Sequence, residues 1–184
     1  MKVLIINNHT KHLKKLQTLI AGNDITVFER EDFVLKEVDD FDLIIISGGS
    51  HVYPVKNHRD TYREEIEFLK TTEKPVIGIC LGCEIIAVAF GSTLQALPAR
   101  ERGICEVQFG KKSIRVYEAH RFSIEAVADK LEVLATSKNG PEIIKHKTKP
   151  IFGFQFHPEM FVNKTEGDEI FLEIISKIRK QCTR

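Results

Sequence analysis

Residues 75–91 read Pro75-Val-Ile-Gly-Ile-Cys80-Leu-Gly-Cys-Glu-Ile-Ile-Ala-Val-Ala-Phe-Gly91. The β-branched run Val76–Ile79 predicts a short strand that is buried on both faces. The apolar spacing of Glu84–Phe90 predicts a helix. Cys80 therefore falls at a strand-to-helix turn, with Gly78 and Gly82 on either side, where bulky residues would crowd a sharp bend.

The rest of the first half repeats this alternation of strands and helices. Short continuous apolar runs predict buried strands, and longer segments with apolar residues at helical spacing lie between them. A βαβ alternation of this kind predicts a parallel sheet with helices on both faces. The predicted strands are Val3–Ile6, Ile25–Phe28, Leu43–Ile46 and Val76–Ile79, and the predicted helices are His12–Ile20 and Arg59–Leu69.

After Gly91 the pattern changes to closely spaced strands separated by turn residues. The charged segments Ala99–Gly103 and Lys145–Lys149 are interpreted as solvated loops and turns. Gly167–Ile178 predicts a closing amphipathic helix. The predicted strands of this half are Ile104–Phe109, Ser113–Glu118, Glu132–Ser137, Glu142–His146 and Ile151–Phe156. The whole chain, residues 1–184, is expected to form a single three-layer α/β domain with a central, mostly parallel sheet flanked by helices.

Composition excludes several other classes of protein. The chain has 184 residues and a net charge of +1, so no excess of positive charge favours nucleic acid. No apolar run reaches the roughly 18 residues of a membrane-spanning helix. The N-terminus is predicted to be a first strand and not a signal peptide. Four cysteines are too few for a disulfide scaffold, which favours a reducing cytoplasm.

The position of Cys80 suits a nucleophile. A thiol at a helix N-terminus lies at the positive end of the helix dipole, which is expected to lower its pKa. The next backbone N–H group, that of Leu81, can point at the oxyanion that forms when the sulfur attacks a carbonyl carbon. Paired glycines in Ser47-Gly48-Gly49-Ser50, after the strand Leu43–Ile46, could supply a second such N–H group.

A cysteine nucleophile needs a base, and the base needs a group that orients it. His157 ends an apolar run at the carboxyl edge of the predicted sheet, where α/β proteins place their sites. Glu159 follows two residues later and can accept a hydrogen bond from the second imidazole nitrogen. The sequence therefore predicts the triad Cys80, His157 and Glu159.

These segments together resemble the class I, or triad-type, glutamine amidotransferases. That family carries a Gly-x-Cys-x-Gly turn, a Gly-Gly loop after an earlier strand and a final His-x-Glu pair, which here are Gly78–Gly82, Gly48-Gly49 and His157–Glu159. The size of the chain and the segment Lys145–Glu159 look most like the free-standing glutaminase subunit of archaeal-type GMP synthases. The resemblance implies a flavodoxin-like fold.

The resemblance also implies a mechanism. Cys80 would attack the side-chain amide of L-glutamine, the N–H groups of Gly49 and Leu81 would stabilise the oxyanion, and a thioester would form and hydrolyse. The ammonia would pass to a synthase partner, and the glutaminase would need neither a cofactor nor a metal. Gly48, Glu84 and His120 are the further candidates for substrate contacts.

Two departures from the family pattern keep other substrates open. The family usually has Gln where this chain has Glu84, and Glu at this place resembles γ-glutamyl hydrolases. The segment Tyr117–Ser123 lacks the Ser and the acidic residues that GMP synthase glutaminases usually carry beside His120. His120 is therefore either a substrate or partner contact, or a histidine of a surface loop. A γ-glutamyl hydrolase or peptidase is the alternative enzyme, and a regulatory module without activity is the other functional class.

Cys80 and Cys83 also form a Cys-x-x-Cys pair. This spacing allows a thioredoxin-like redox pair or two metal ligands. No second pair of cysteines or histidines in the sequence completes a zinc site, and a redox pair does not explain His157. Oxidation that links the two cysteines and switches an amidase off is a further hypothesis.

Overall fold

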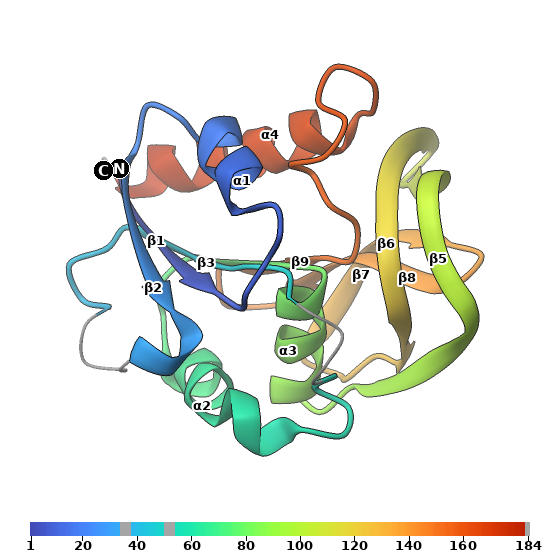
Figure 1. Ribbon diagram of the computed structural model, residues 1–184, viewed down its shortest axis with the longest axis horizontal. Helices are drawn as coiled ribbons and strands as arrows, with labels where there is room; N and C mark the ends of the chain where they lie inside the picture. The colour runs from blue at the N-terminus through green and yellow to red at the C-terminus, as the bar shows by residue number, and fades with distance from the viewer. Residues whose placement is uncertain (34–37, 50–53, 183–184) are drawn as a thin grey trace.

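The computed structural model describes residues 1–33, 38–49 and 54–182, and Figure 1 shows their arrangement. The strands of this described part form one sheet in the order β2-β1-β3-β4-β9-β8-β7-β5-β6. The bounds of the strands are β1 Lys2–Asn7, β2 Asp24–Glu29, β3 Leu43–Ile46, β4 Val76–Ile79, β5 Thr93–Phe109, β6 Lys112–Ala126, β7 Leu131–Ser137, β8 Gly140–His146 and β9 Ile151–Phe154. The bounds of the helices are α1 Leu13–Leu19, α2 Arg63–Thr71, α3 Leu81–Ala89 and α4 Gly167–Cys182, with short 3-10 helices η1 Arg30–Asp32 and η3 Arg59–Tyr62.

The sheet is parallel over the half that carries the predicted nucleophile. Strands β2, β1, β3, β4 and β9 pair in parallel, and Gly78 of β4 lies between Ile46 of β3 and Gly153 of β9. The carboxyl ends of these strands therefore meet at one edge of the sheet. This arrangement confirms the α/β fold predicted from the sequence.

The other half of the sheet is antiparallel. Strand β8 pairs with β9, β7 with β8, β5 with β7 and β6 with β5. In Figure 1 the long β5–β6 hairpin stands at the right of the molecule, beyond α3. The sheet as a whole is mixed, and only its first half follows the βαβ rule of parallel sheets.

Two buried clusters cover the two faces of the sheet, because alternate side chains of each strand point to opposite faces. On β1, Leu4 and Ile6 belong to the cluster that α2 and α3 cover, while Val3 and Ile5 belong to the cluster under α1 and α4. Figure 1 shows these two helix pairs on opposite sides of the sheet. Burial on both faces explains why the strands are continuously apolar in sequence.

The prediction of a loop at Ala99–Gly103 is wrong. These residues lie within β5, and Glu101 and Arg102 pair with His120 and Ala119 of β6. Their side chains are largely exposed, since β5 and β6 form an outer hairpin. A solvent-facing strand can carry charged residues at successive positions, which a sequence pattern does not distinguish from a loop.

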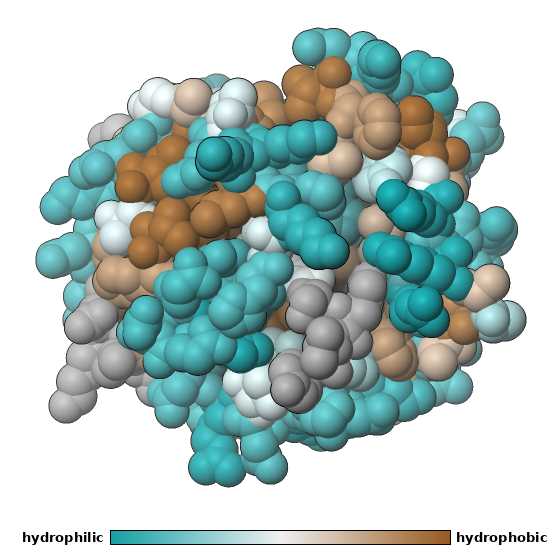
Figure 2. Space-filling view, viewed as in Figure 1, coloured by the Kyte–Doolittle hydropathy of each residue, from teal (hydrophilic) through white to brown (hydrophobic). Residues whose placement is uncertain are grey.

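The surface in the view of Figure 1 is mostly hydrophilic, as Figure 2 shows, with hydrophobic residues gathered towards the left and the top of that view. The largest exposed apolar side chains among the described residues are Ile104, Val133, Phe161, Val162 and Leu172. Within the described part of the chain, no helix has the length and apolar character that crossing a membrane requires.

The packing around β4 predicts that Gly82→Ala destabilises the protein. A Cβ atom at Gly82 would overlap the backbone carbonyl oxygen of Ile46, which cannot rotate away. We expect the free energy of unfolding to fall by about 3 kcal/mol, at the upper end of overpacking effects. Urea denaturation measures this change.

Gly48→Ala is the matched control for Gly82→Ala. A Cβ atom at Gly48 would lie 3.2 Å from the nearest atom, Cε1 of His157, and would overlap no backbone atom. We therefore expect a smaller loss of stability for this variant. Equal losses in both variants would contradict the packing account.

Candidate active site

Cys80 lies at the turn between β4 and α3 in a conformation that L-residues rarely adopt. Its backbone angles are φ 52° and ψ −105°. Its N–H group donates to the carbonyl of Phe154 at 2.7 Å, and its own carbonyl accepts from the N–H group of Glu84 at 3.0 Å. These bonds hold the strained residue in place. Backbone strain of this kind is common where a turn between a strand and a helix carries a nucleophile.

The flanking glycines make this turn possible, as the sequence predicts. A Cβ atom at Gly78 would overlap the backbone of Gly82, and one at Gly82 would overlap Ile46 of the neighbouring strand. The first turn of α3 is therefore packed directly against β3 and β4. Leu81 is the first residue of α3, and N–H groups in this position have no carbonyl partner within their own helix.

His157 and Glu159 form the expected pair beside Cys80. Nδ1 of His157 lies 2.8 Å from Oε1 of Glu159, and both side chains are buried. The backbone N–H group of His157 donates to the carbonyl of Tyr117 at 2.9 Å. The carboxylate fixes Nδ1 as the donor, so that the Nε2 nitrogen is the one available to the thiol.

The electrostatics of Cys80 differ from the sequence-based expectation. Burial raises the pKa of the Cys80 thiol, and the attraction of His157 opposes this effect. Because the thiol is almost fully enclosed, loss of hydration outweighs the helix dipole that the sequence suggested. For His157, burial lowers the pKa, but Cys80 and Glu159 together raise it well above 6.5. The imidazolium is thus the favoured form of His157 when it faces a thiolate.

Gly48 and Gly49 lie against the nucleophile turn. A Cβ atom on Gly48 would lie 3.6 Å from Cβ of Cys80, and one on Gly49 would overlap the side chain of Leu81. Gly49 therefore lies too close to the start of α3 for a side chain, and Gly48 lies at contact distance from Cys80. Ser50, the last residue of the predicted loop, lies outside the described residues.

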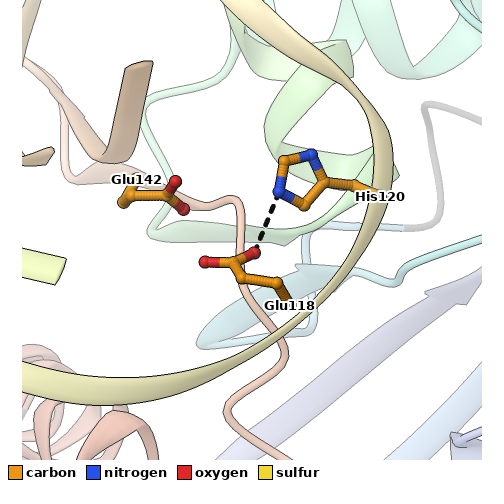
Figure 3. A group of neighbouring side chains, drawn as sticks. All are labelled: Glu118, His120 and Glu142. Atoms are coloured by element: carbon orange, nitrogen blue, oxygen red, sulfur yellow. Dashed lines mark ion pairs between the residues drawn. The ribbon is translucent and has the colours of Figure 1, made fainter. Parts of the chain in front are cut away.

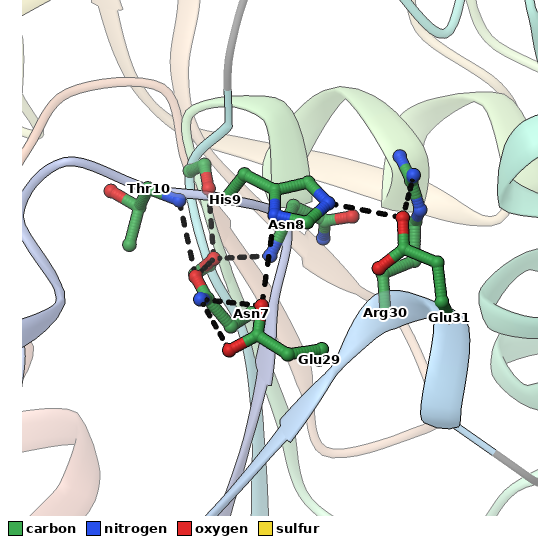
Figure 4. A network of polar contacts seen from close by, with 9 residues as sticks. Asn7, Asn8, His9, Thr10, Glu29, Arg30 and Glu31 are labelled. Atoms are coloured by element: carbon green, nitrogen blue, oxygen red, sulfur yellow. Dashed lines mark hydrogen bonds and ion pairs between the residues drawn. The ribbon is translucent and has the colours of Figure 1, made fainter.

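A network of polar side chains anchors this loop to the ends of β1 and β2 (Figure 4). The hydroxyl of Ser47 accepts from the N–H group of Asn8 at 2.9 Å and donates to the carbonyl of Gly48 at 2.8 Å. The amide of Asn7 donates to both carboxylate oxygens of Glu29, at 3.0 and 2.9 Å. The network therefore ties the start of the glycine loop to the end of β1, and β1 to the end of β2.

A cavity of about 620 Å³ opens over His157 and Gly49. Residues of the loop after β1 and of the β5–β6 hairpin line it, and its charged side chains are basic. His12 packs edge-on against the ring of His157, with 5.6 Å between ring centroids. Residue patterns did not identify this lining, because it comes from strands distant in sequence. The basic lining residues are His9, Lys11, His12, Arg100 and Arg121.

Glu84 and His120 lie in the interior instead of lining this cavity. Glu84 is buried on α3, and its Oε1 accepts from the amide of Gln155 at 3.4 Å. His120 is fully buried on β6, whereas its neighbours Ala119 and Arg121 line the cavity. The interpretation of His120 as a surface-loop histidine is therefore wrong.

Cys83 lies apart from Cys80. Cys80 and Cys83 are both free thiols, and they belong to different core clusters on the two faces of the sheet. A Cβ atom on Gly153 would lie 2.7 Å from the sulfur of Cys83, so this sulfur packs against β9. Burial raises the pKa of the Cys83 thiol well above 9. Cys83 is thus a core residue in this structure.

Known proteins share both the sequence pattern and the fold. The family model for glutamine amidotransferase class-I matches residues 4–177. The glutamine-hydrolysing GMP synthase subunit of Methanocaldococcus jannaschii is 35% identical over 138 residues, which are 69% of each chain. The protein of the same name from Methanothermobacter thermautotrophicus is 28% identical and covers 92% of this chain and 94% of its own.

Solved structures agree with this relationship. A Thermoplasma acidophilum protein, proposed to be a GMP synthase subunit, superposes with a TM-score of 0.86 at 25% identity and covers 100% of this chain and 96% of its own. A glutamine amidotransferase from Thermotoga maritima shares the fold, with a TM-score of 0.71 at 16% identity over 98% of this chain and 85% of its own. The chain belongs to the class I glutamine amidotransferase family.

Proposed function

We propose that this chain is a glutaminase that hydrolyses the side-chain amide of L-glutamine and supplies the ammonia to a synthase partner of the GMP synthase type. The observation that carries the proposal is the strained Cys80 at the start of α3, next to a histidine whose Nδ1 lies 2.8 Å from a carboxylate oxygen of Glu159. This arrangement supports Cys80 as the nucleophile, His157 as the base and Glu159 as the group that orients it.

In the proposed mechanism, the thiolate of Cys80 attacks the amide carbon of glutamine. The N–H groups of Gly49 and Leu81 stabilise the oxyanion of the tetrahedral intermediate. The imidazolium of His157 gives its proton to the leaving nitrogen, so ammonia departs and a thioester to Cys80 remains. Glu159 holds the imidazole ring in the orientation that both steps need.

Water then hydrolyses the thioester. His157 takes a proton from the attacking water, the carbon–sulfur bond breaks, and glutamate leaves with the sulfur regenerated as a thiolate. All groups in this cycle belong to the chain itself. The basic cavity over His157 suits the α-carboxylate of the substrate, and Arg100 and Arg121 are its candidate partners.

The names of the related archaeal proteins support the synthase partner. They are subunits of glutamine-hydrolysing GMP synthases, and the chain matches two of them over 69% and 94% of their length. A glutaminase subunit of this kind works when ammonia can pass to an acceptor site. We therefore expect activity to rise when the partner synthase is present.

A second candidate function follows from Glu84. The family usually carries a glutamine at this position. This chain carries a glutamate, which resembles γ-glutamyl hydrolases. Burial raises the pKa of Glu84 to about 7, although Gln155 and His120 oppose this shift. Below pH 7 the group is therefore mostly uncharged and resembles the family's glutamine in charge. This property favours the glutaminase over the hydrolase at mildly acid pH.

The proposal is tested by measuring ammonia and glutamate release from L-glutamine, with and without the partner synthase. We expect equal amounts of both products. We also expect the rate of their release to fall by at least roughly 10³-fold in Cys80→Ala. In Glu159→Gln the fold should be retained and the rate of product release should fall by roughly 10²–10⁴-fold.

A panel of γ-glutamyl peptides is assayed in parallel. Turnover of the peptides alone would favour the hydrolase, and no turnover with the partner present would favour a module without activity.

The charge of Glu84 predicts a pH-dependent KM. We expect the KM for L-glutamine to rise several-fold between pH 6 and 8, because an ionised Glu84 would put a negative charge one helical turn from Cys80, in an interior that screens its repulsion of the anionic substrate poorly. In Glu84→Gln the KM should stay flat over this range. Glu65→Gln is the control, since Glu65 is also buried with a pKa raised to about 7. A wild-type rise that persists in Glu84→Gln would contradict this role.

A further inference from the structure

A second cluster of ionisable groups lies inside the protein, away from the nucleophile. Glu118 and His120 are two residues apart on β6, so their side chains share one face, and Glu142 comes from β8 (Figure 3). One ligand-type atom of each residue lies within 4.8 Å of the other two. The exposed fractions of these residues are 1%, 0% and 2%, so water does not solvate the cluster.

The hydrogen bonds around His120 leave a lone pair directed into this cluster. Nδ1 of His120 lies 2.7 Å from the carbonyl oxygen of Phe122, which can only accept, so Nδ1 carries the proton. In the neutral ring, Nε2 is then an acceptor. This nitrogen lies 3.0 Å from Oε2 of Glu118, which is also an acceptor when ionised. Two acceptors at this distance need a positively charged species between or beside them.

The carboxylates leave further acceptors without partners. Ser137 donates to Oε1 of Glu142 at 2.6 Å. Within the described residues, no side chain donates a hydrogen bond to Oε1 of Glu118 or to Oε2 of Glu142, and Oε2 of Glu118 has only the ion pair with His120. Burial and the neighbouring Glu118 carboxylate raise the pKa of Glu142 to about 9, so a proton shared by the two carboxyl groups is the competing form of compensation. Buried carboxyl oxygens without partners are costly unless a cation or a proton compensates for them.

We propose that Glu118, His120 and Glu142 bind a divalent transition-metal ion, of which zinc fits the donors best. One imidazole and two carboxylates form a mixed nitrogen and oxygen set that suits zinc, with bonds of roughly 2.0–2.2 Å, and leaves a position for water. Magnesium and calcium prefer sites with oxygen donors alone. The carbonyl of Phe122 and the hydroxyl of Ser137 orient two of the three ligands, as outer partners do in metal sites.

The structure also offers the ion a way in. A cavity of about 300 Å³ between the β5–β6 hairpin and the β7–β8 turn is lined by Glu118 and Ser137. Glu101, Glu106 and Lys138 lie along the same cavity, and Lys138 pairs with Glu101 at 3.6 Å, so besides Glu118 the lining keeps one more carboxylate than it has cations.

The metal would act as a brace between β6 and β8. β6 pairs directly with β5 at the end of the sheet, and β8 lies nearer the centre, between β7 and β9. The same stretch of β6 carries Tyr117, whose carbonyl accepts from the backbone N–H group of His157 at 2.9 Å. An ion that fixes Glu118 to Glu142 would therefore also fix the backbone that positions His157.

The test is zinc binding to the full chain in the Cys80→Ala background, which removes the catalytic thiol as a competing ligand. After treatment with a chelator, Zn²⁺ alone is added and followed by elemental analysis after gel filtration and by thermal unfolding. We expect one zinc per chain and a rise of several degrees in Tm. Glu118→Gln and Glu142→Gln should each lose the zinc and the rise in Tm. Glu65→Gln, a buried glutamate elsewhere, should keep both.

Two outcomes would overturn the proposal. The first is a chain that binds no zinc and shows no change in Tm, in which case protons alone neutralise the cluster. The second is zinc binding that both glutamine variants retain. If the variants fail to fold, X-ray absorption of the zinc-loaded protein decides, because the proposal requires nitrogen and oxygen neighbours and a sulfur neighbour would contradict it. This test is independent of glutaminase activity.

Discussion

The backbone bend at Cys80 is the constraint on which the rest of the structure depends. A residue with a φ of 52° persists only where its surroundings hold it, and here the N–H group bonds to β9 while the carbonyl starts α3. The bend leaves space for no side chain at Gly78 or Gly82, so β3, β4 and α3 pack backbone against backbone. The thiol is thereby fixed at the carboxyl edge of the sheet. The glycine loop after β3 and the His157 segment after β9 leave the sheet at the same edge.

The two halves of the sheet make different contributions to the site. The parallel half brings the proposed nucleophile Cys80, the glycine loop and the His157 segment to one edge. The antiparallel half supplies the wall of the cavity, because the β5–β6 hairpin carries Arg100 and Arg121 over His157. Behind this wall, Glu118 and His120 of the hairpin lie close to Glu142 of β8, and the proposed metal ion would join the two. Under this proposal, the geometry of the site depends in part on the stability of the outer hairpin.

Much of this arrangement could be predicted from the sequence, because local patterns determine it. The predicted strands Leu43–Ile46 and Val76–Ile79 match β3 and β4 residue for residue, since burial on both faces gives a continuous apolar run. The nucleophile turn was predictable because only glycine fits beside it. By contrast, the environment of His120 was not predictable. It depends on Glu142, which is 22 residues away in the sequence, and the charged residues beside His120 in its strand give no sign that its side chain is fully buried. The pKa of Cys80 was predicted in the wrong direction, because burial cannot be read from a helix N-terminus alone.

The most direct test of the central claim is covalent trapping of the nucleophile. A diazoketone analogue of L-glutamine is incubated with the chain in the presence of its synthase partner, and the modified peptides are identified by mass spectrometry. We predict a single adduct on Cys80 that L-glutamine prevents and that is absent in Cys80→Ala. Labelling of Cys83 or Cys105 instead, or labelling that persists in Cys80→Ala, would contradict the account.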